Sequence, residues 1–529
     1  METANLASSH VRGLEPPHVS LTRLAALASR ITLCEGAHDQ IAVPAPYTGE
    51  IIGTIPAARD ADVELAVQHA RAAQPAWAAR SFADRSKIFF RFYDLLIGRH
   101  EEALDLIQLE TGKARCHAHE EILDTAIVSR YYAMRAEKLL RPRRRKGAFP
   151  LLTRTWEFRS PVGVAGFIVP WNYPLTLAVT DAVPALMAGN TAVLKPDRQT
   201  SFTALWAVSL LREAGLPADV FPVVTGDGSV IGPALAQCVD FLMFTGSTST
   251  GKSVAARAAS RLIGCSLELG GKNPMIVCAD ANLEAAVGGA IRGCFSSVGQ
   301  LCVSIERIYI HESIFDRFAA RFTDRARKLK MGAAFDYSVD LGSLTSQRQL
   351  SKVEEHVHDA VDKGATVLAG GHRRPELGPL FYEPTILTEV HENMKAYAEE
   401  TFGPVVSLYK FKNEDEAIER ANATSYGLNA SVWTRNISRG IDLARRIRAG
   451  SVNVNEAYIA AWGSVDSPIG GMKESGISRR HGEEGILKFT EPQTVAVQRL
   501  PVVPPGRMTW DSFAQWLIRL LRLLRYTRI

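Results

Sequence analysis

Residues 162–174 read VGVAGFIVPWNYP, an unbroken apolar run that stops where two prolines enclose Trp171, Asn172 and Tyr173. A short continuous apolar run next to Gly and Pro is typical of a strand buried on both faces. Helical spacing of the apolar residues begins directly afterwards, over 175–187. This strand-then-helix unit predicts an α/β fold on a parallel sheet, because parallel neighbours need a crossover connection, usually a helix.

The same unit recurs further along the chain. Apolar runs at 191–194, 220–224 and 241–244 are each followed by a helical stretch, at 203–213, 230–237 and 252–261. A second alternation of strands and helices extends from about residue 269 to residue 470. The sequence therefore predicts two α/β regions, the first of them a doubly wound sheet.

The composition excludes several classes of protein. With 529 residues, 46% hydrophobic and 22% charged, the chain is neither disordered, nor collagen-like, nor a small disulfide scaffold. Lys and Arg outnumber Asp and Glu by 61 to 56, an excess too small to indicate nucleic acid as a partner. Seven scattered cysteines and a polar N-terminal stretch favour a reduced, cytoplasmic protein, and no zinc-ligand spacing is present. No apolar run reaches the roughly 18 residues of a membrane-spanning helix.

Two short motifs carry candidate nucleophile and base residues. Gly299-Gln300-Leu301-Cys302 places a cysteine after a glycine turn, where its sulfur can be exposed and activated as a thiolate. Glu268 precedes two glycines, and burial would raise the proton affinity of its carboxylate enough for base catalysis. Taken alone, each residue also fits a plainer interpretation, as an inert core cysteine and as a surface glutamate that ends a strand.

Two further motifs lie where predicted strands end, which is where doubly wound sheets bind ligands. Asn172 follows the strand at 162–169, and its amide could donate to a developing oxyanion. The plainer interpretation of Asn172 is a rigid turn between prolines. Residues 245–251, TGSTSTG, follow the strand at 241–244 and precede a helix whose N-terminus could bind phosphate.

Taken together and in this order, the four motifs resemble those of the aldehyde dehydrogenase superfamily. The resemblance covers roughly residues 40–500. It includes Lys195-Pro196, the segment 400–404 (ETFGP), the segment 450–453 (GSVN) and the segment 468–476 (PIGGMKESG). This resemblance implies an α/β fold with a Rossmann-like cofactor domain, a catalytic α/β domain and a small strand-based oligomerisation element.

The resemblance also implies roles for individual residues. Cys302 would attack the aldehyde carbon, forming a thiohemiacetal and then a thioester, Asn172 would meet the oxyanion, and Glu268 would activate the water that releases the acid. The implied cofactor-binding residues are Trp171, Lys195, Arg198, Gly246, Ser247, Glu400 and Phe402. Of these, Lys195 would reach the adenosine ribose, Ser247 the pyrophosphate and Glu400 the nicotinamide ribose, while Phe402 would pack against the ring.

Arg198 departs from the pattern of relatives that prefer NAD. Those relatives usually carry a glutamate three residues after the lysine, and this chain reads Lys195-Pro196-Asp197-Arg198. A glutamate would repel a 2′-phosphate, whereas an arginine could pair with it. We therefore expect NADP to be preferred, with NAD left open because Asp197 lies close by.

The substrate is less well defined by the sequence. The Lys-Pro-Asp variant and the proline-containing C-terminal extension look most like succinate-semialdehyde dehydrogenases of the actinobacterial type. Better-known semialdehyde enzymes carry arginines near the positions of Thr180 or Asp181 and of Ser296, and Arg292 is the nearest upstream arginine here. Succinate semialdehyde is the first expectation, and uncharged aliphatic, long-chain or aromatic aldehydes stay open.

The expected organisation has five parts, and a homodimer or homotetramer is the expected assembly. These parts are a lead-in (1–40), the cofactor domain (41–147 and 160–268), the catalytic domain (269–475), the oligomerisation element (148–159 and 476–500) and a tail (501–529). Two rival functions remain. A CoA-acylating enzyme usually lacks the hydrolytic glutamate, and a non-catalytic member would be expected to lose Cys302, Glu268 or Asn172.

The tail carries most of the net charge. Residues beyond Leu500 include five arginines and one acid, Asp511, so 56 basic and 55 acidic residues remain in the first 500. Residues 510–529 place apolar side chains on one helical face and mostly polar ones on the other. A basic amphipathic helix with tryptophans suits a membrane interface, and it also suits docking on protein.

Overall fold

The computed structural model describes residues 16–147, 152–499 and 503–526. Residues 1–15 of the expected lead-in, 148–151 and 500 of the expected oligomerisation element, and 501–502 and 527–529 of the expected tail lie outside these ranges. Within the described residues, no helix is long and apolar enough to cross a bilayer.

The expected α/β fold is confirmed, with a five-stranded cofactor sheet near the centre. Its strand order is β18-β8-β7-β5-β6, and all neighbours are parallel except β18, which runs antiparallel to β8. The strands are β5 (Val164–Ile168), β6 (Thr191–Lys195), β7 (Phe241–Thr245), β8 (Gly264–Glu268) and β18 (Gly476–Ile477).

Helices cover both faces of this sheet. Successive side chains of a strand point to opposite faces, so an apolar strand makes both faces apolar and both need covering. In β5, Val164 and Ile168 join one apolar core, whereas Ala165 and Phe167 join another. The first core includes α2 (Asp60–Ala78), α9 (Gly228–Cys238) and α10 (Thr248–Ser260). The second includes α3 (Phe82–Gly98), α4 (His100–Thr111), α5 (Arg115–Leu140), α6 (Pro174–Val179), α7 (Ala182–Met187) and α8 (Ser201–Glu213).

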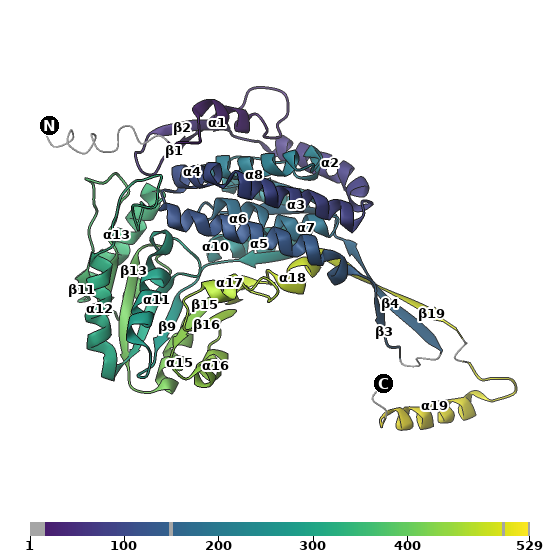
Figure 1. Cartoon of the computed structure of the whole chain (residues 1–529). Coiled ribbons are helices and arrows are strands. Elements are labelled where there is room, and N and C mark those ends of the chain that lie inside the picture. Colours follow the sequence, from purple (N-terminus) through teal and green to yellow (C-terminus); the bar gives the residue numbers. More distant parts are fainter. Residues whose placement is uncertain (1–15, 148–151, 500–502, 527–529) are drawn as a thin grey trace.

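A seven-stranded sheet forms the second α/β region, and Figure 1 shows it beside the first. Its order is β11-β12-β13-β10-β9-β15-β16, parallel throughout except for the β11–β12 pair. The strands are β9 (Asn273–Val277), β10 (Ile305–His311), β11 (Thr366–Ala369), β12 (Thr385–Thr388), β13 (Val405–Phe411), β15 (Asn429–Trp433) and β16 (Ser451–Val454). One face packs against α11 (Leu283–Phe295) and α12 (Phe315–Arg327). The other packs against α13 (Gln347–Asp362), α15 (Glu414–Asn422) and α16 (Ile437–Arg446).

A third, antiparallel sheet extends from the body as an arm (Figure 1). It contains β3 (Arg143–Arg145), β4 (Thr153–Pro161) and β19 (Thr490–Gln498), in the order β19-β4-β3. The segment 476–487 does not join this arm. It contributes β18 to the cofactor sheet and α18 (Gly482–Leu487) to the packing around α5 and α7. Beyond the arm, α19 (Trp510–Leu524) ends the described chain.

Two expected elements of the cofactor region differ in the structure. The expected strand at 220–224 is wrong: a 3-10 turn covers Ala218–Val220, and only Val223 bridges to Leu194. Pro222 cannot donate to a ladder of hydrogen bonds, so a strand cannot extend there. The expected helix at 175–187 is divided into α6 and α7, because Pro184 has no N–H to donate to the carbonyl four residues earlier.

Candidate active site

Cys302 follows a turn in which three consecutive residues have positive φ angles. After α11 the chain passes through Ser297, Val298 and Gly299 with φ of 49°, 57° and 70°. A Cβ at Gly299 would lie 2.1 Å from the carbonyl oxygen of Gly403, so no other residue fits there. The sequence motif GQLC is therefore explained by packing as well as by chemistry.

The resting Cys302 is a thiol rather than a thiolate. Burial, with the negative charge of Glu268 as a second cause, raises its pKa to about 12. The side-chain amide of Asn273 donates to the Cys302 carbonyl oxygen at 2.8 Å and holds the backbone in place. Attack on a substrate therefore requires a base that removes the proton.

Glu268 is the base that the structure brings near this thiol. It ends β8, is 7% exposed, and burial raises its pKa to about 7. Its Oε1 has no hydrogen-bond partner among the described residues, and a Cβ at Gly470 would lie 3.0 Å from that atom. A carboxylate with this pKa can both accept and return a proton near neutral pH.

A buried ion cluster near Glu268 was not predicted from the sequence. Asp181 forms ion pairs with Arg480 and with Lys488, whose Nζ lies 3.3 Å from Asp181 Oδ1. The positive charges of Arg480 and Lys488 oppose the effect of burial on the pKa of Glu268. No local pattern marks these residues, because the partners are separated by about three hundred positions in the chain.

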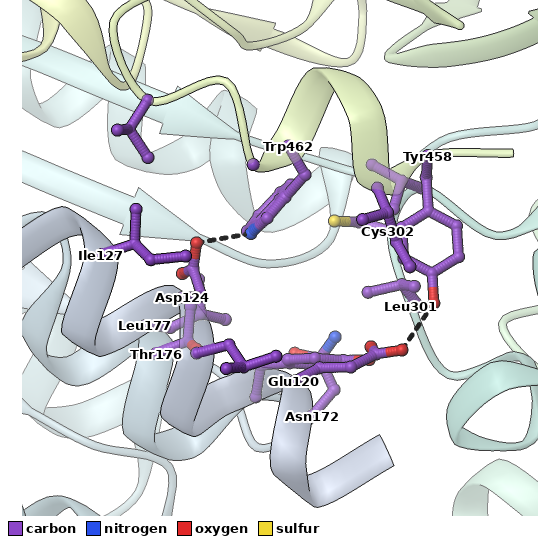
Figure 2. Close-up of a pocket in the computed structure, with 16 residues that line it drawn as sticks. Glu120, Asp124, Ile127, Asn172, Thr176, Leu177, Leu301, Cys302, Tyr458 and Trp462 are labelled. Atoms are coloured by element: carbon purple, nitrogen blue, oxygen red, sulfur yellow. Dashed lines mark hydrogen bonds between the residues drawn. The ribbon is translucent and has the colours of Figure 1, made fainter. Parts of the chain in front are cut away.

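Asn172 lies in the loop between β5 and α6, beside the cysteine turn. Its side-chain Nδ2 donates to the carbonyl oxygen of Gln300 at 3.1 Å, and its side chain is buried. Asn172 and Cys302 line the same channel (Figure 2). The structure therefore places an amide donor on the same channel as Cys302, an arrangement that an oxyanion site requires.

A buried ion pair fixes the loop that carries Asn172. The Lys113 Nζ donates to the Asn172 carbonyl oxygen at 2.6 Å and to Glu121 at 2.8 Å. Glu121 in turn accepts from the backbone N–H groups of Leu175 and Thr176 at 2.8 and 3.2 Å. Sequence reasoning missed this pair, although Lys113 and Glu121 are eight residues apart.

The channel that leads to Cys302 is open to solvent and has mainly apolar walls. Figure 2 shows the sulfur directed into it between Tyr458 and Trp462. The apolar lining residues are Leu123, Ile127, Leu177, Leu301, Val303, Ile459 and Val465. No Lys or Arg is among the described residues that line it.

Two carboxyl groups lie in the channel wall. Glu120 accepts from the hydroxyls of Tyr173 and Tyr458, each at 2.9 Å. Asp124 accepts from the indole N–H of Trp462 at 2.7 Å, and burial raises its pKa to about 7. Among the described residues, the channel lining therefore contains two acidic groups and no basic residue.

Arg292, which the sequence analysis weighed for a substrate carboxylate, and the buried Arg480 both lie outside the channel lining. Arg292 is paired with Glu456 at 2.5 Å and does not line the channel. Arg480 lies behind the wall, 5.9 Å from the centroid of the Trp462 ring, and is held by Asp181. The channel thus presents no basic side chain to a carboxylate.

A second, open cleft of about 1490 Å³ lies at the carboxyl ends of β5, β6 and β7. Five of the expected cofactor residues line it, namely Trp171, Lys195, Arg198, Gly246 and Ser247. Sequence reasoning did not find Asp227, Ser229, Arg257 and Arg348, which also line the cleft. They come from the start of α9, from α10 and from α13.

The cleft offers phosphate-binding groups of several kinds. Ser247 caps α10, and its Oγ accepts from the N–H of Thr250 at 3.4 Å, so this helix N-terminus opens into the cleft. Lys195 is buried at the end of β6, and burial lowers its pKa. Arg198 is largely exposed, and its guanidinium lies 3.5 Å from Asp227.

Glu400 and Phe402 lie between the cleft and the thiol. Glu400 accepts from the Gly271 N–H at 2.7 Å, and burial raises its pKa to about 7. The negative charge of Glu400 also raises the pKa of Cys302. Phe402 has φ of 57° and meets Trp171 edge-on, with ring centroids 5.5 Å apart. Glu400 thus interacts with the thiol, and Phe402 contacts Trp171, which lines the cleft.

Comparison with known proteins agrees with this arrangement. Residues 34–495 match the model of the aldehyde dehydrogenase family, so the chain belongs to this family. It is 52% identical over 454 residues to a Mycobacterium tuberculosis protein named "Putative succinate-semialdehyde dehydrogenase (NADP+) 2", covering 86% of this chain and 88% of that protein.

Two solved structures are similar throughout most of the chain. One is an NADP-dependent enzyme of E. coli, with a TM-score of 0.85, 35% identity and coverage of 90% of this chain and 99% of that one. The other is an aldehyde dehydrogenase of Bacillus cereus in complex with NAD+, with a TM-score of 0.84, 34% identity and coverage of 90% and 98%.

Proposed function

We propose that this protein oxidises an aldehyde to its carboxylic acid through a covalent adduct on Cys302. The observation that carries the proposal is that Cys302 and Asn172 line one channel while Glu268, with a pKa of about 7, lies near the thiol. Each of the three groups serves a step of acyl chemistry that the other two cannot serve.

The residues act in a defined order. Glu268 takes the proton of the Cys302 thiol, and the sulfur adds to the aldehyde carbon to form a thiohemiacetal. The Asn172 amide turns from Gln300 to the oxyanion, together with the backbone N–H of Cys302. Glu268 releases this first proton to solvent. After oxidation to the thioester, Glu268 takes a proton from water, and the resulting hydroxide adds to the acyl carbon and expels the Cys302 thiolate. The acid is formed, and Glu268 returns its proton to the sulfur.

The second cleft fits a dinucleotide with an extra phosphate. The α10 N-terminus, Lys195 and Arg198 offer a helix terminus and two cations to phosphate and ribose groups. When bound, the nicotinamide supplies the hydride acceptor that the oxidation requires. We therefore propose NADP as the preferred cofactor, with NAD also accepted because Asp227 partly neutralises Arg198.

The name of the mycobacterial relative supports succinate semialdehyde as the first substrate to test. The channel favours a second candidate class, uncharged aliphatic or aromatic aldehydes. Its described walls are apolar and contain Glu120 and Asp124 but no Lys or Arg, and a buried carboxylate of a substrate is costly without a cationic partner.

A kinetic matrix tests both proposals. Succinate semialdehyde, a long-chain aldehyde and an aromatic aldehyde are each assayed with NAD and with NADP, and acid release is measured without CoA. The proposal expects acid without CoA and higher kcat/KM with NADP. A requirement for CoA would replace it with a CoA-acylating function, and no turnover of any aldehyde would favour a non-catalytic protein.

We further propose a homodimer or homotetramer in the cytoplasm. The nine-residue strand β19 is an edge of the arm sheet, and Val495 and Val497 are exposed on it, which makes it a template for pairing with another copy. All seven cysteines are free, as in a reducing compartment. Peripheral membrane contact is proposed for the C-terminal tail.

A further inference from the structure

The helix α19 presents apolar side chains that no core of the protein covers. Trp510, Trp516, Leu521 and Leu523 are 67%, 49%, 54% and 66% exposed. None of the apolar cores formed by the described residues includes a residue of α19. Figure 1 shows the helix apart from the two main sheets, beyond the arm.

These apolar residues form one continuous arc of the helix. At about 100° per residue, roughly half of the circumference is apolar. The arc contains Trp510, Phe513, Ala514, Trp516, Leu517, Leu520, Leu521, Leu523 and Leu524; Phe513 is buried, and the others are partly or largely exposed. Within it the rings of Trp510, Phe513 and Trp516 follow one another with centroids 6.0 and 5.9 Å apart. Transfer of such an arc from water into another apolar phase is favourable in proportion to the apolar area removed from water.

The opposite face and its borders carry positive charge. Arg519 and Arg522 lie on the polar face, and Arg525 lies where the polar face meets the apolar arc. At that border a long arginine side chain can cover apolar surface while its guanidinium stays at a polar headgroup. Tryptophan and arginine at such positions are typical of a helix that lies in a lipid interface.

Charge complementarity favours lipid over a protein surface of this chain. Residues 1–500 carry 56 basic and 55 acidic groups, whereas residues 501–529 carry five basic groups and one acidic group. The body, whether of the same or of a second copy, therefore carries no net negative charge that would attract the tail. An anionic bilayer offers both the negative charge and the apolar phase.

We propose that α19 docks this protein on an anionic lipid surface. The helix lies parallel to the bilayer plane, with its apolar arc at the acyl boundary and its arginines among the headgroups. The proposal goes beyond the aldehyde chemistry and does not depend on which aldehyde is oxidised.

Cosedimentation with vesicles tests the proposal. The full chain is mixed with phosphatidylcholine vesicles that contain or lack phosphatidylglycerol, and a chain of residues 1–505, which keeps β19 intact, serves as the comparison. We expect the full chain to pellet with the anionic vesicles and the shortened chain to stay in the supernatant. A full chain that stays in solution, or a shortened chain that pellets equally, would overturn the proposal.

Two sets of variants separate the contribution of charge to vesicle binding from the contribution of apolar contact. Replacement of Arg519, Arg522 and Arg525 by Gln should weaken binding to anionic vesicles roughly tenfold or more, and Leu520→Ser with Leu521→Ser should abolish it. The polar-face variant Gln515→Ala is the matched control and should bind like the parent chain. Equal binding by all variants would overturn the proposal.

Sedimentation velocity without lipid distinguishes lipid from a second copy as the occupant. The full chain and the 1–505 chain should have the same assembly state and the same aldehyde oxidation in solution. A smaller assembly for the shortened chain would mean that another copy covers the apolar arc, and would overturn the proposal.

Discussion

At the residue scale, the surroundings of Glu268 set the pKa of its carboxyl group. It lies at the end of β8, where burial raises its pKa and the positive charges of Arg480 and Lys488 limit that rise to about 7. In water the same group would titrate several pH units lower and would be a poor base. Burial next to a cationic cluster therefore explains how a glutamate can take a proton near neutral pH.

This pKa predicts the pH dependence of turnover. In the proposed mechanism the ionised form of Glu268 is the active base, so kcat should rise as pH increases through about 7. In Glu268→Gln, kcat should fall strongly and this rise should be lost. A pH profile of kcat for both proteins checks the prediction, and an unchanged profile in the variant would contradict it.

Arg198 provides a prediction on cofactor choice. Arg198→Glu would replace a phosphate-pairing cation by an anion, and it should lower kcat/KM for NADP relative to NAD by roughly 10- to 100-fold. Arg257→Gln, in the same cleft but on α10, is a control for general loss of charge. If the ratio of the two kcat/KM values does not change in Arg198→Glu, Arg198 does not select the cofactor.

At the scale of elements, α5 and the segment before it support the loop that carries Asn172. Lys113 and Glu121 are both buried, and together they bind the Asn172 carbonyl and the first N–H groups of α6. Removal of one partner of a buried pair leaves an uncompensated charge and costs about 3–5 kcal/mol of folding stability.

Lys113→Met should therefore destabilise the protein and lower kcat more than it changes KM, because the oxyanion donor loses its support. Lys87→Met, at an exposed ion pair on α3, is the control and should change stability by less than about 0.5 kcal/mol. Thermal unfolding and steady-state kinetics measure both effects. Equal behaviour of the two variants would show that Lys113 does not position the loop.

The elements also show what the sequence could predict. The buried strands β5, β6 and β7 and the motifs at their ends follow from continuous apolar runs and from Gly and Pro, which act locally. The pairs Asp181–Arg480 and Lys113–Asn172 form only when distant segments meet in the fold, so no local pattern indicates them. The expected strand at 220–224 does not form because Pro222 has no N–H for a ladder of hydrogen bonds, although the segment is apolar.

In the whole molecule, the proposed catalytic and cofactor sites lie in a different region from the exposed apolar surfaces that we expect to make contacts. The channel and the cofactor cleft lie in the near-neutral body, whereas the exposed strand β19 and the basic helix α19 lie at its periphery (Figure 1). We expect assembly contacts to involve the arm and lipid contacts to involve the tail.

Val495→Lys with Val497→Lys should therefore reduce the molar mass of the assembly in solution, since two charges would be placed on the edge strand. Light scattering coupled to size-exclusion chromatography measures that mass. Ile437→Lys, at an exposed apolar position on α16, is the control and should leave it unchanged. An unchanged mass in the β19 variant would exclude this strand as the contact.

The covalent role of Cys302 is tested most directly by intact-protein mass spectrometry of the protein quenched in acid during turnover of an aldehyde with NADP. Quenching stops hydrolysis and preserves the thioester, so the protein should gain the mass of one acyl group, located on the peptide that contains Cys302. The same experiment with Cys302→Ala should show no gain. Acid formation by Cys302→Ala, or an acyl group on any other cysteine, would contradict the account.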